Sequence, residues 1–298
     1  MNTFKTIVAV ILTAIAAIML YVLFLLSNVS SFFSTENIEK TASNIDVAHE
    51  INKIRNSTAT AGQKEEIADI INTAYEEAES HGISTKLVDE IFNSNEVKEF
   101  LGQAIGTTTD YVINGKEGKT LTSEDFNKLV DDNIDKWIDN SDMDISDTKK
   151  EVLVIRLKSA SAGIIDNLPN QTTIDSKIDQ NMIKDIQFIF SSEVKTALVI
   201  ITLVSLIIVI FLKKNEKRFL SYMASAPLIA GVMTVATSFI MTDIITLALN
   251  EYNLSFMVTS FSSSFSHNIL ITGLVSIIVS IVLFIIYGLI YKKSTKRA

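Results

Sequence analysis

The residues with the clearest potential for chemistry are the aspartates of segment 131–147, DDNIDKWIDNSDMDISD. Four of them fall in an expected loop between two helices: Asp139, Asp142, Asp144 and Asp147. Calcium takes six or more oxygen ligands, which a flexible loop rich in aspartate can supply. The EF-hand pattern is not met, because no glycine stands at the sixth position and no glutamate at the twelfth. Cation binding is therefore one interpretation, and helix capping with solvation is the other.

Other catalytic and cofactor motifs are missing from the sequence. The chain has no cysteine, which excludes disulfides, cysteine zinc sites and thiol catalysis. Its histidines, His49, His81 and His267, lie far apart and form no HExxH pair. There is no GxSxG motif, no Walker P-loop and no glycine-rich dinucleotide fingerprint. We therefore expect neither an enzyme nor a resident cofactor or metal.

Four long apolar runs organise the chain. They contain no charged residue and cover 6–26, 196–212, 219–241 and 269–291. A bilayer core of about 30 Å needs roughly 20 helical residues, so each run is predicted to be a transmembrane helix. The first run is longer than a typical signal-peptide core, and no small-residue cleavage site follows it. Residues 1–26 are therefore interpreted as an uncleaved anchor rather than as a signal peptide.

The placement of cations orients the four predicted spans. Turn 213–218 and tail 292–298 each carry four Lys or Arg residues, whereas loop 242–268 carries none. Lys and Arg concentrate in cytoplasmic loops. With four spans, the turn and both termini fall on the same side of the membrane. The sequence therefore predicts cytoplasmic termini and an extracytoplasmic location for residues 27–194.

Residues 27–194 form an acidic segment with the periodicity of amphipathic helices. They contain 31 Asp and Glu against 16 Lys and Arg, a net charge of −15. Such a charge disfavours nucleic acid as a partner. Apolar residues recur at helical spacing with no alternating run, which predicts a helical domain with its own core. The expected helices cover about 36–55, 65–81, 94–112, 122–138, 146–166 and 173–191.

Local signals mark the expected ends of several of these helices. Gly82 is predicted to stop one helix, and Ser84 to cap the next. Thr122 or Ser123 is predicted to cap the helix that follows a turn at 114–120. The last helix is expected to continue into the second span or to bend near residue 191.

Small residues recur every four positions in the third and fourth spans. Small side chains let helices approach closely in lipid, so these positions are predicted to pack the two spans together or against a partner. The predicted packing residues are Ala226, Ala230, Thr234 and Ser238 in the third span, and Thr272, Ser276 and Ser280 in the fourth.

Two ionisable residues flank the predicted outer ends of these spans. Asp243 and His267 could pair at the membrane interface, or each could be solvated there. The loop 250–267 carries apolar residues at spacings of four and three, which suits an interfacial helix or a re-entrant segment. Because the loop lacks Lys and Arg, a packed cap over the bundle or a docking face for the outer domain is the preferred interpretation. No charged residue lies in the middle of a span, which argues against an ion-coupled pump.

Together these observations predict an all-α, four-span integral membrane protein. A helical extracytoplasmic domain, 27–194, is inserted between the first and second transmembrane helices, and 195–298 form the remaining membrane domain. We expect a non-catalytic protein of a bacterial plasma membrane, the organism class being inferred from the Ile-, Asn- and Lys-rich composition. Its outer domain would bind, sense or scaffold an envelope partner. The alternative is a transporter or channel subunit gated by that domain; in either case the partners are lipid, another membrane or envelope protein, or a second copy of the chain.

Overall fold

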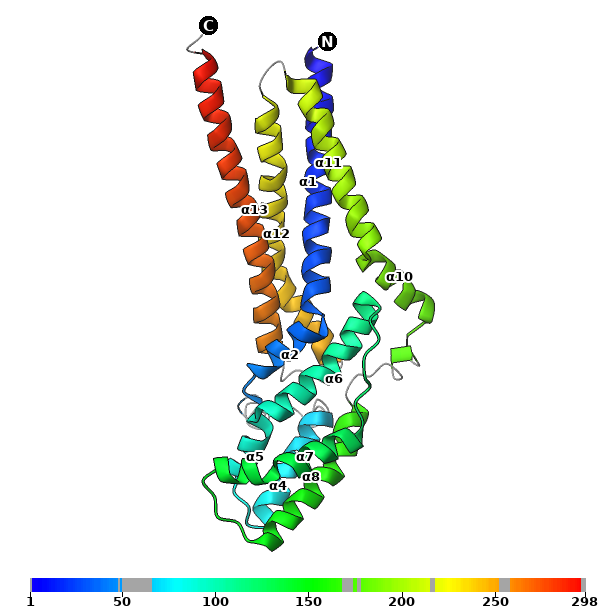
Figure 1. Cartoon of the computed structure of the whole chain (residues 1–298), viewed down its shortest axis with the longest axis vertical. Helices are drawn as coiled ribbons and strands as arrows, with labels where there is room; N and C mark the ends of the chain where they lie inside the picture. The colour runs from blue at the N-terminus through cyan, green and yellow to red at the C-terminus, as the bar shows by residue number, and fades with distance from the viewer. Residues whose placement is uncertain are drawn as a thin grey trace. The chain divides into compact units, whose positions relative to one another are not determined.

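The chain is described here from a computed structural model. Every regular element in the described part is an α-helix, and no strand occurs there (Figure 1). The described residues are 2–47, 49, 66–167, 174–175, 178–214, 218–251 and 258–295. The chain divides into two units. The four-helix unit comprises Met1–Ser31, Asp185–Thr242 and Ser264–Ala298, and the helical-domain unit comprises Phe32–Lys184 and Asp243–Ser263.

The four-helix unit contains four helices that are long and apolar enough to cross a membrane. They are α1 (Asn2–Phe32), α11 (Ser192–Lys213), α12 (Phe219–Glu251) and α13 (Val258–Thr295). The end of α12 from Asp243 and the start of α13 up to Ser263 are assigned to the helical-domain unit, as is Phe32. Their outer faces expose large aliphatic side chains, such as Ile200, Ile207 and Ile278. A surface of this kind is suited to lipid rather than water. The prediction of an all-helical fold is confirmed for the described residues, as is the prediction of four helices that are long and apolar enough to span a membrane.

The core of the four-helix unit is built from small side chains. Ala16 and Ala17 of α1 are buried against Ala226 of α12, with Leu20 and Leu206 packed beside them. Without a large hydrophobic driving force in lipid, close van der Waals packing of such residues holds helices together. Alanines at this point therefore allow α1 to approach its neighbours closely.

The helical-domain unit has a core of larger side chains. Trp137 and Tyr75 are fully buried, and the rings of Phe100 and Phe126 pack edge to face with centroids 5.3 Å apart. Aromatic pairs of this geometry stabilise a core beyond the area they bury. The helices of this unit are α2 (Thr35–Ser43), α4 (Glu66–Ser80), α5 (Thr85–Asn93), α6 (Asn95–Asn114), α7 (Ser123–Asn140) and α8 (Asp147–Asn167).

Several helix ends lie where the sequence places them. Gly82 follows α4 with φ of +65°, a conformation that favours glycine. The Ser84 hydroxyl accepts the Lys86 N–H at the start of α5. Thr122 begins α7 in a capping box with Asp125, in which each side chain accepts the other residue's backbone N–H.

Two expected helices are shorter in the structure. The helix expected at 36–55 is α2, which ends at Ser43, and most of the remaining stretch lies outside the described residues. The helix expected from residue 173 is α10 (Gln180–Phe190). Ser191 then adopts an extended backbone and caps α11 by accepting the Val194 N–H, so the chain bends there as one of the two predictions states.

Residues 258–267 belong to the segment expected to form an interfacial helix, a re-entrant segment or a packed cap, and they are helical. These residues form the first turns of α13 and continue directly into the fourth spanning helix. Phe261 and Phe265 are each only 2% exposed, so the apolar spacing reflects packing against protein. Residues 252–257 lie outside the described part of the chain.

Candidate functional site

The best-defined polar geometry of the four-helix unit lies between α12 and α13. The Ser276 hydroxyl donates to the Pro227 carbonyl oxygen over 2.7 Å. The Ser280 hydroxyl donates to the Ala224 carbonyl oxygen over 2.6 Å. Both serines are buried, at 5% and 0% exposure. Two side chains of α13 therefore bond directly to the backbone of α12.

The two bonds lie next to the proline inside α12. Pro227 has no N–H, so the helical bond to the carbonyl of residue 223 cannot form, and its ring crowds the preceding turn. Prolines are tolerated in membrane helices where neighbouring Ser and Thr side chains bond to the weakened backbone. Ser280 bonds to the Ala224 carbonyl, one residue after the carbonyl that loses its helical partner, and Ser276 bonds to the carbonyl of Pro227 itself. We call these four residues, Ala224, Pro227, Ser276 and Ser280, the proline seam.

Two glycines bring the helix backbones together beside the proline seam. A Cβ built on Gly231 would lie 2.7 Å from the Gly273 carbonyl oxygen. A Cβ on Gly273 would lie 2.9 Å from the Gly231 carbonyl oxygen. Any side chain at either position would collide with the opposite backbone. The sequence reasoning did not include these glycines, although Gly231 directly follows Ala230 of the small-residue repeat.

The predicted packing residues of the third span face the interior of the four-helix unit. Ala226, Ala230 and Thr234 have no exposed surface, and Ser238 is 4% exposed. The hydroxyls of Thr234 and Ser238 donate to the backbone of their own helix. The Thr272 hydroxyl of α13 has two acceptors within reach, the side-chain oxygen of Asn28 on α1 at 3.1 Å and the Asn268 carbonyl oxygen of its own helix at 3.0 Å.

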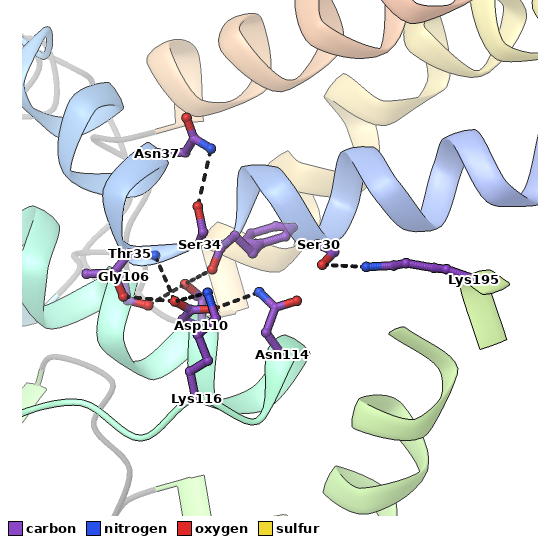
Figure 2. A network of polar contacts seen from close by, with 11 residues as sticks. Ser30, Ser34, Thr35, Asn37, Gly106, Asp110, Asn114, Lys116 and Lys195 are labelled. Carbon is purple, nitrogen blue, oxygen red and sulfur yellow. Dashed lines mark hydrogen bonds and ion pairs between the residues drawn. The ribbon is translucent and has the colours of Figure 1, made fainter. Parts of the chain in front are cut away.

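Two lysines, one at each end of the apolar part of α11, donate hydrogen bonds to α1. Lys195 Nζ donates to the Ser30 hydroxyl over 2.8 Å (Figure 2), and Lys213 Nζ donates to the Thr6 hydroxyl over 2.7 Å. The lysines are 18 residues apart, about 27 Å along a helix. That distance is close to the roughly 30 Å of a bilayer core. Lys213 was expected in the turn 213–218, but it is the last residue of α11 and is only 1% exposed.

The acidic loop predicted to bind a cation is open to solvent. Asp139, Asp142, Asp144 and Asp147 are all exposed, and Asp142 has φ of +54°. Nowhere in the described ranges do three or more His, Asp or Glu side chains form a group that could hold a metal ion. Cation binding by these aspartates therefore stays a prediction without structural support. Asp147 is the first residue of α8, where a carboxylate stabilises the helix dipole.

The predicted pair of Asp243 and His267 also stays a prediction. Both side chains are exposed, on α12 and α13 respectively. Asp243 belongs to the helical-domain unit and His267 to the four-helix unit.

An acidic groove of about 560 Å³ lies between α2, α6 and α7 in the helical-domain unit. Its apolar lining consists of Phe100 and Leu129. Four glutamates and one lysine give the lining a net negative charge: Glu36, Glu39, Glu96, Glu99 and Lys40. Burial raises the pKa of Glu39, and the negative charges of Glu99 and Glu36 raise it further. In contrast, the pKa of Glu96 is lowered, chiefly by its hydrogen bond from Lys136. The groove therefore concentrates negative charge that a cationic group would stabilise.

Asp110 of α6 links this helix to the start of α2 (Figure 2). Its side chain is almost fully buried and accepts hydrogen bonds from the Thr35 N–H and hydroxyl, both over 3.2 Å. The Asn114 amide donates to the same carboxylate over 2.7 Å. A carboxylate at a helix N-terminus bonds to N–H groups that lack a helical partner. Asp110 therefore has a structural role at the α2–α6 contact.

Sequence reasoning missed this contact, although a signal was present. Gly102, Gly106 and Asp110 follow one another at spacings of four on one face of α6. A Cβ on Gly102 would lie 2.8 Å from Glu39 Cα, and one on Gly106 would lie 2.9 Å from Thr35 Cα. The backbone of α2 therefore packs in direct contact with Gly102 and Gly106 of α6.

Comparisons with known proteins give no match: no protein-family model, no curated protein and no solved structure is similar to this chain.

Proposed function

We propose that the chain is a non-catalytic, four-span membrane protein whose helical domain binds, senses or scaffolds an envelope partner. The contrast between its two units carries this proposal. The four-helix unit exposes large aliphatic side chains, whereas the helical-domain unit buries its aromatic residues in a core. The sequence of 27–194, which includes most of that domain, has a net charge of −15. An apolar anchor and an acidic, water-facing domain suit a protein that presents a binding surface next to a membrane.

The proposed topology places both termini in the cytoplasm and residues 27–194 outside it. Its support is the distribution of cations: turn 213–218 and the C-terminal tail are rich in Lys and Arg, and loop 242–268 has none. The proposed location is the plasma membrane of a bacterium.

The acidic groove is the surface we expect a partner to contact. Its apolar and acidic lining residues complement a segment that carries both apolar side chains and Lys or Arg. The proline seam supports an anchor rather than a transport path, because its serine hydroxyls are bonded to the helix backbone. A transporter needs polar groups that face a water-filled path.

Co-purification with paired charge-reversal variants tests this proposal. The tagged full chain is extracted in detergent from native membranes, and bound proteins are quantified by mass spectrometry. We expect one membrane or envelope protein to be recovered in fixed stoichiometry, and to be lost with Glu39→Lys/Glu99→Lys. The matched control, Asp139→Lys/Asp144→Lys, makes the same charge change in the exposed loop and should retain the partner.

Two results would overturn the proposal. One is recovery of the chain without any stoichiometric partner, and the other is equal loss of the partner with both pairs of substitutions. Fluorescence of Trp137, the single tryptophan of the chain, shows whether each variant keeps the core of the helical domain.

A further inference from the structure

A second hollow of the helical-domain unit lies between α4, α5 and α8. Its volume is about 190 Å³. The apolar part of its wall consists mainly of deeply buried side chains, each at most 5% exposed: Ala78, Ile83, Val88, Ile91, Leu153 and Leu157. We call this hollow the α4–α8 pocket. It lies apart from the acidic groove, with which it shares no lining residue.

The polar lining residues of the α4–α8 pocket are the accessible ones. Glu77 and Arg156 have side chains that are 37% and 48% exposed, and Thr73, His81 and Ser159 are exposed as well. The pocket therefore has an apolar floor and a polar mouth. Sites for small molecules are built this way, with a mainly apolar wall and a few convergent polar groups.

The size of the pocket limits what it can hold. An apolar cavity of about 150 Å³ accommodates one benzene ring in another protein. A volume of about 190 Å³ therefore suits one branched aliphatic or one aromatic side chain, and excludes a drug-sized molecule. Filling such a hollow restores van der Waals contacts that its wall atoms lack.

The charges at the mouth define the head group of the ligand. Arg156 Nη1 lies 3.4 Å from Glu77 Oε1, which makes a partly exposed ion pair. Such pairs are weak in water and are rearranged at little cost. The guanidinium group can bind a carboxylate with two parallel hydrogen bonds, and the glutamate can accept from an ammonium group. Opposite charges this close match a ligand in which a carboxylate and an ammonium group are attached to the same carbon atom.

We propose that the α4–α8 pocket binds a free α-amino acid with an aliphatic or aromatic side chain. The side chain occupies the apolar floor, the carboxylate contacts Arg156 and the ammonium contacts Glu77. This inference goes beyond the partner-binding role and does not depend on which partner the domain contacts, because every group involved lies within the helical-domain unit.

Isothermal titration of the full chain in detergent micelles tests the proposal. The probes are L-leucine and L-phenylalanine. The comparison compounds are 4-methylpentanoate, which lacks the ammonium, 3-methylbutylamine, which lacks the carboxylate, and glycine, which lacks the side chain. We expect saturable binding of at least one probe. Each comparison compound should bind at least about tenfold more weakly than that probe, because it lacks a charged hydrogen-bonding group or the side chain that would be buried.

Variants separate this site from binding elsewhere. Arg156→Gln removes the carboxylate contact and should weaken binding at least about tenfold. Ala74→Leu fills the pocket from its α4 wall and should abolish binding. Lys158→Gln on the same helix is the matched control, because Lys158 pairs with Asp131 and does not line the pocket. It should bind as the unaltered chain does. If Ala74→Leu loses the native fluorescence of Trp137, the domain core is disturbed in that variant, and the comparison of Arg156→Gln with Lys158→Gln alone tests the site.

The proposal is overturned if neither probe binds, or if a compound that lacks one charge binds as tightly as the amino acid. It is also overturned if Arg156→Gln and Lys158→Gln bind equally well, because the site would then lie elsewhere.

Discussion

Replacing Gly273 by alanine tests the close contact between α12 and α13. The added Cβ would lie 2.9 Å from the Gly231 carbonyl oxygen and 2.7 Å from Val235 Cγ2. Cβ contacts below 3.4 Å are already tight. The two helices must therefore separate by roughly half an ångström to accept the methyl group, because packed backbones cannot absorb the overlap otherwise.

The expected magnitude follows from three terms. Overpacking of a well-packed contact costs about 1–3 kcal/mol. The separation also stretches the bonds of Ser276 and Ser280, now 2.7 and 2.6 Å, and interhelical bonds in membranes contribute about 0.6 kcal/mol each. Alanine is better than glycine in a helix by about 0.8–1.0 kcal/mol. The net expectation is a loss of about 1–3 kcal/mol in the unfolding free energy of the four-helix unit.

The assay is unfolding of the full chain in mixed micelles with increasing SDS, followed by circular dichroism. Gly288→Ala is the matched control, because it lies on the same helix and its Cβ would meet nothing within 4 Å. Fluorescence of Trp137 reports on the helical domain in the same sample. The reasoning is refuted if Gly273→Ala resists SDS as well as Gly288→Ala does.

Three further predictions concern the helical domain and are read from Trp137 fluorescence during thermal unfolding of the full chain. Gly106→Ala should lower the unfolding temperature by a few degrees, because its Cβ would lie 2.9 Å from Thr35 Cα; an unchanged temperature would contradict the α2–α6 contact. Asp125→Ala should cost about 1 kcal/mol near pH 7, because it removes the carboxylate that accepts the Thr122 N–H in the capping box. The pKa of Asp125 is lowered, chiefly by its hydrogen bond from Lys119, so the stabilisation is present above the ordinary value of 3.8 and is lost as pH falls through the lowered pKa. The variant and the unaltered chain should therefore converge in acid, and a gap that is constant with pH would contradict this. Glu39→Gln should stabilise the domain near pH 7, because the raised pKa of Glu39 reflects an unfavourable charge; the gain should vanish below the ordinary value of 4.5, and a gain that persists there would contradict the assignment.

Local chemistry explains why much of the fold could be predicted from the sequence. The four apolar runs and the caps at Ser84 and Thr122 depend on residues close together in the chain. Whether an apolar run can span a membrane depends on its helical length, and where a cap forms depends on which backbone N–H groups at the helix end lack partners. Gly82 is a similar case, because glycine adopts a positive φ at little cost.

Contacts between helices could not be predicted as well, because they depend on which faces meet. The repeat from Ala226 to Ser238 indicated a packing face, but nothing in it identified the backbone of α13 as the neighbour of Gly231. The bonds of Ser276 and Ser280 to carbonyls near Pro227 require that register.

The grouping of acidic residues in space also could not be predicted from their spacing in the sequence. The aspartates of 139–147 are close in sequence but all exposed, since like charges separate and solvate unless a ligand gathers them. Glu39 and Glu99 are far apart in sequence and meet in the acidic groove only because α2 packs on α6. The gathering of acidic side chains in the groove therefore depends on how the helices pack and could not be predicted from the sequence.

Cysteine labelling tests the central claim, a membrane protein with its acidic domain outside the cytoplasm, most directly. The chain has no cysteine, so single substitutions give an unambiguous signal. Asn140→Cys places a thiol at the exposed end of α7, and Ser294→Cys places one near the end of α13. The account predicts that a membrane-impermeant maleimide labels Asn140→Cys in intact bacterial cells, and labels Ser294→Cys only after the cells are permeabilised. Labelling of Ser294→Cys in intact cells, with Asn140→Cys protected, would contradict it.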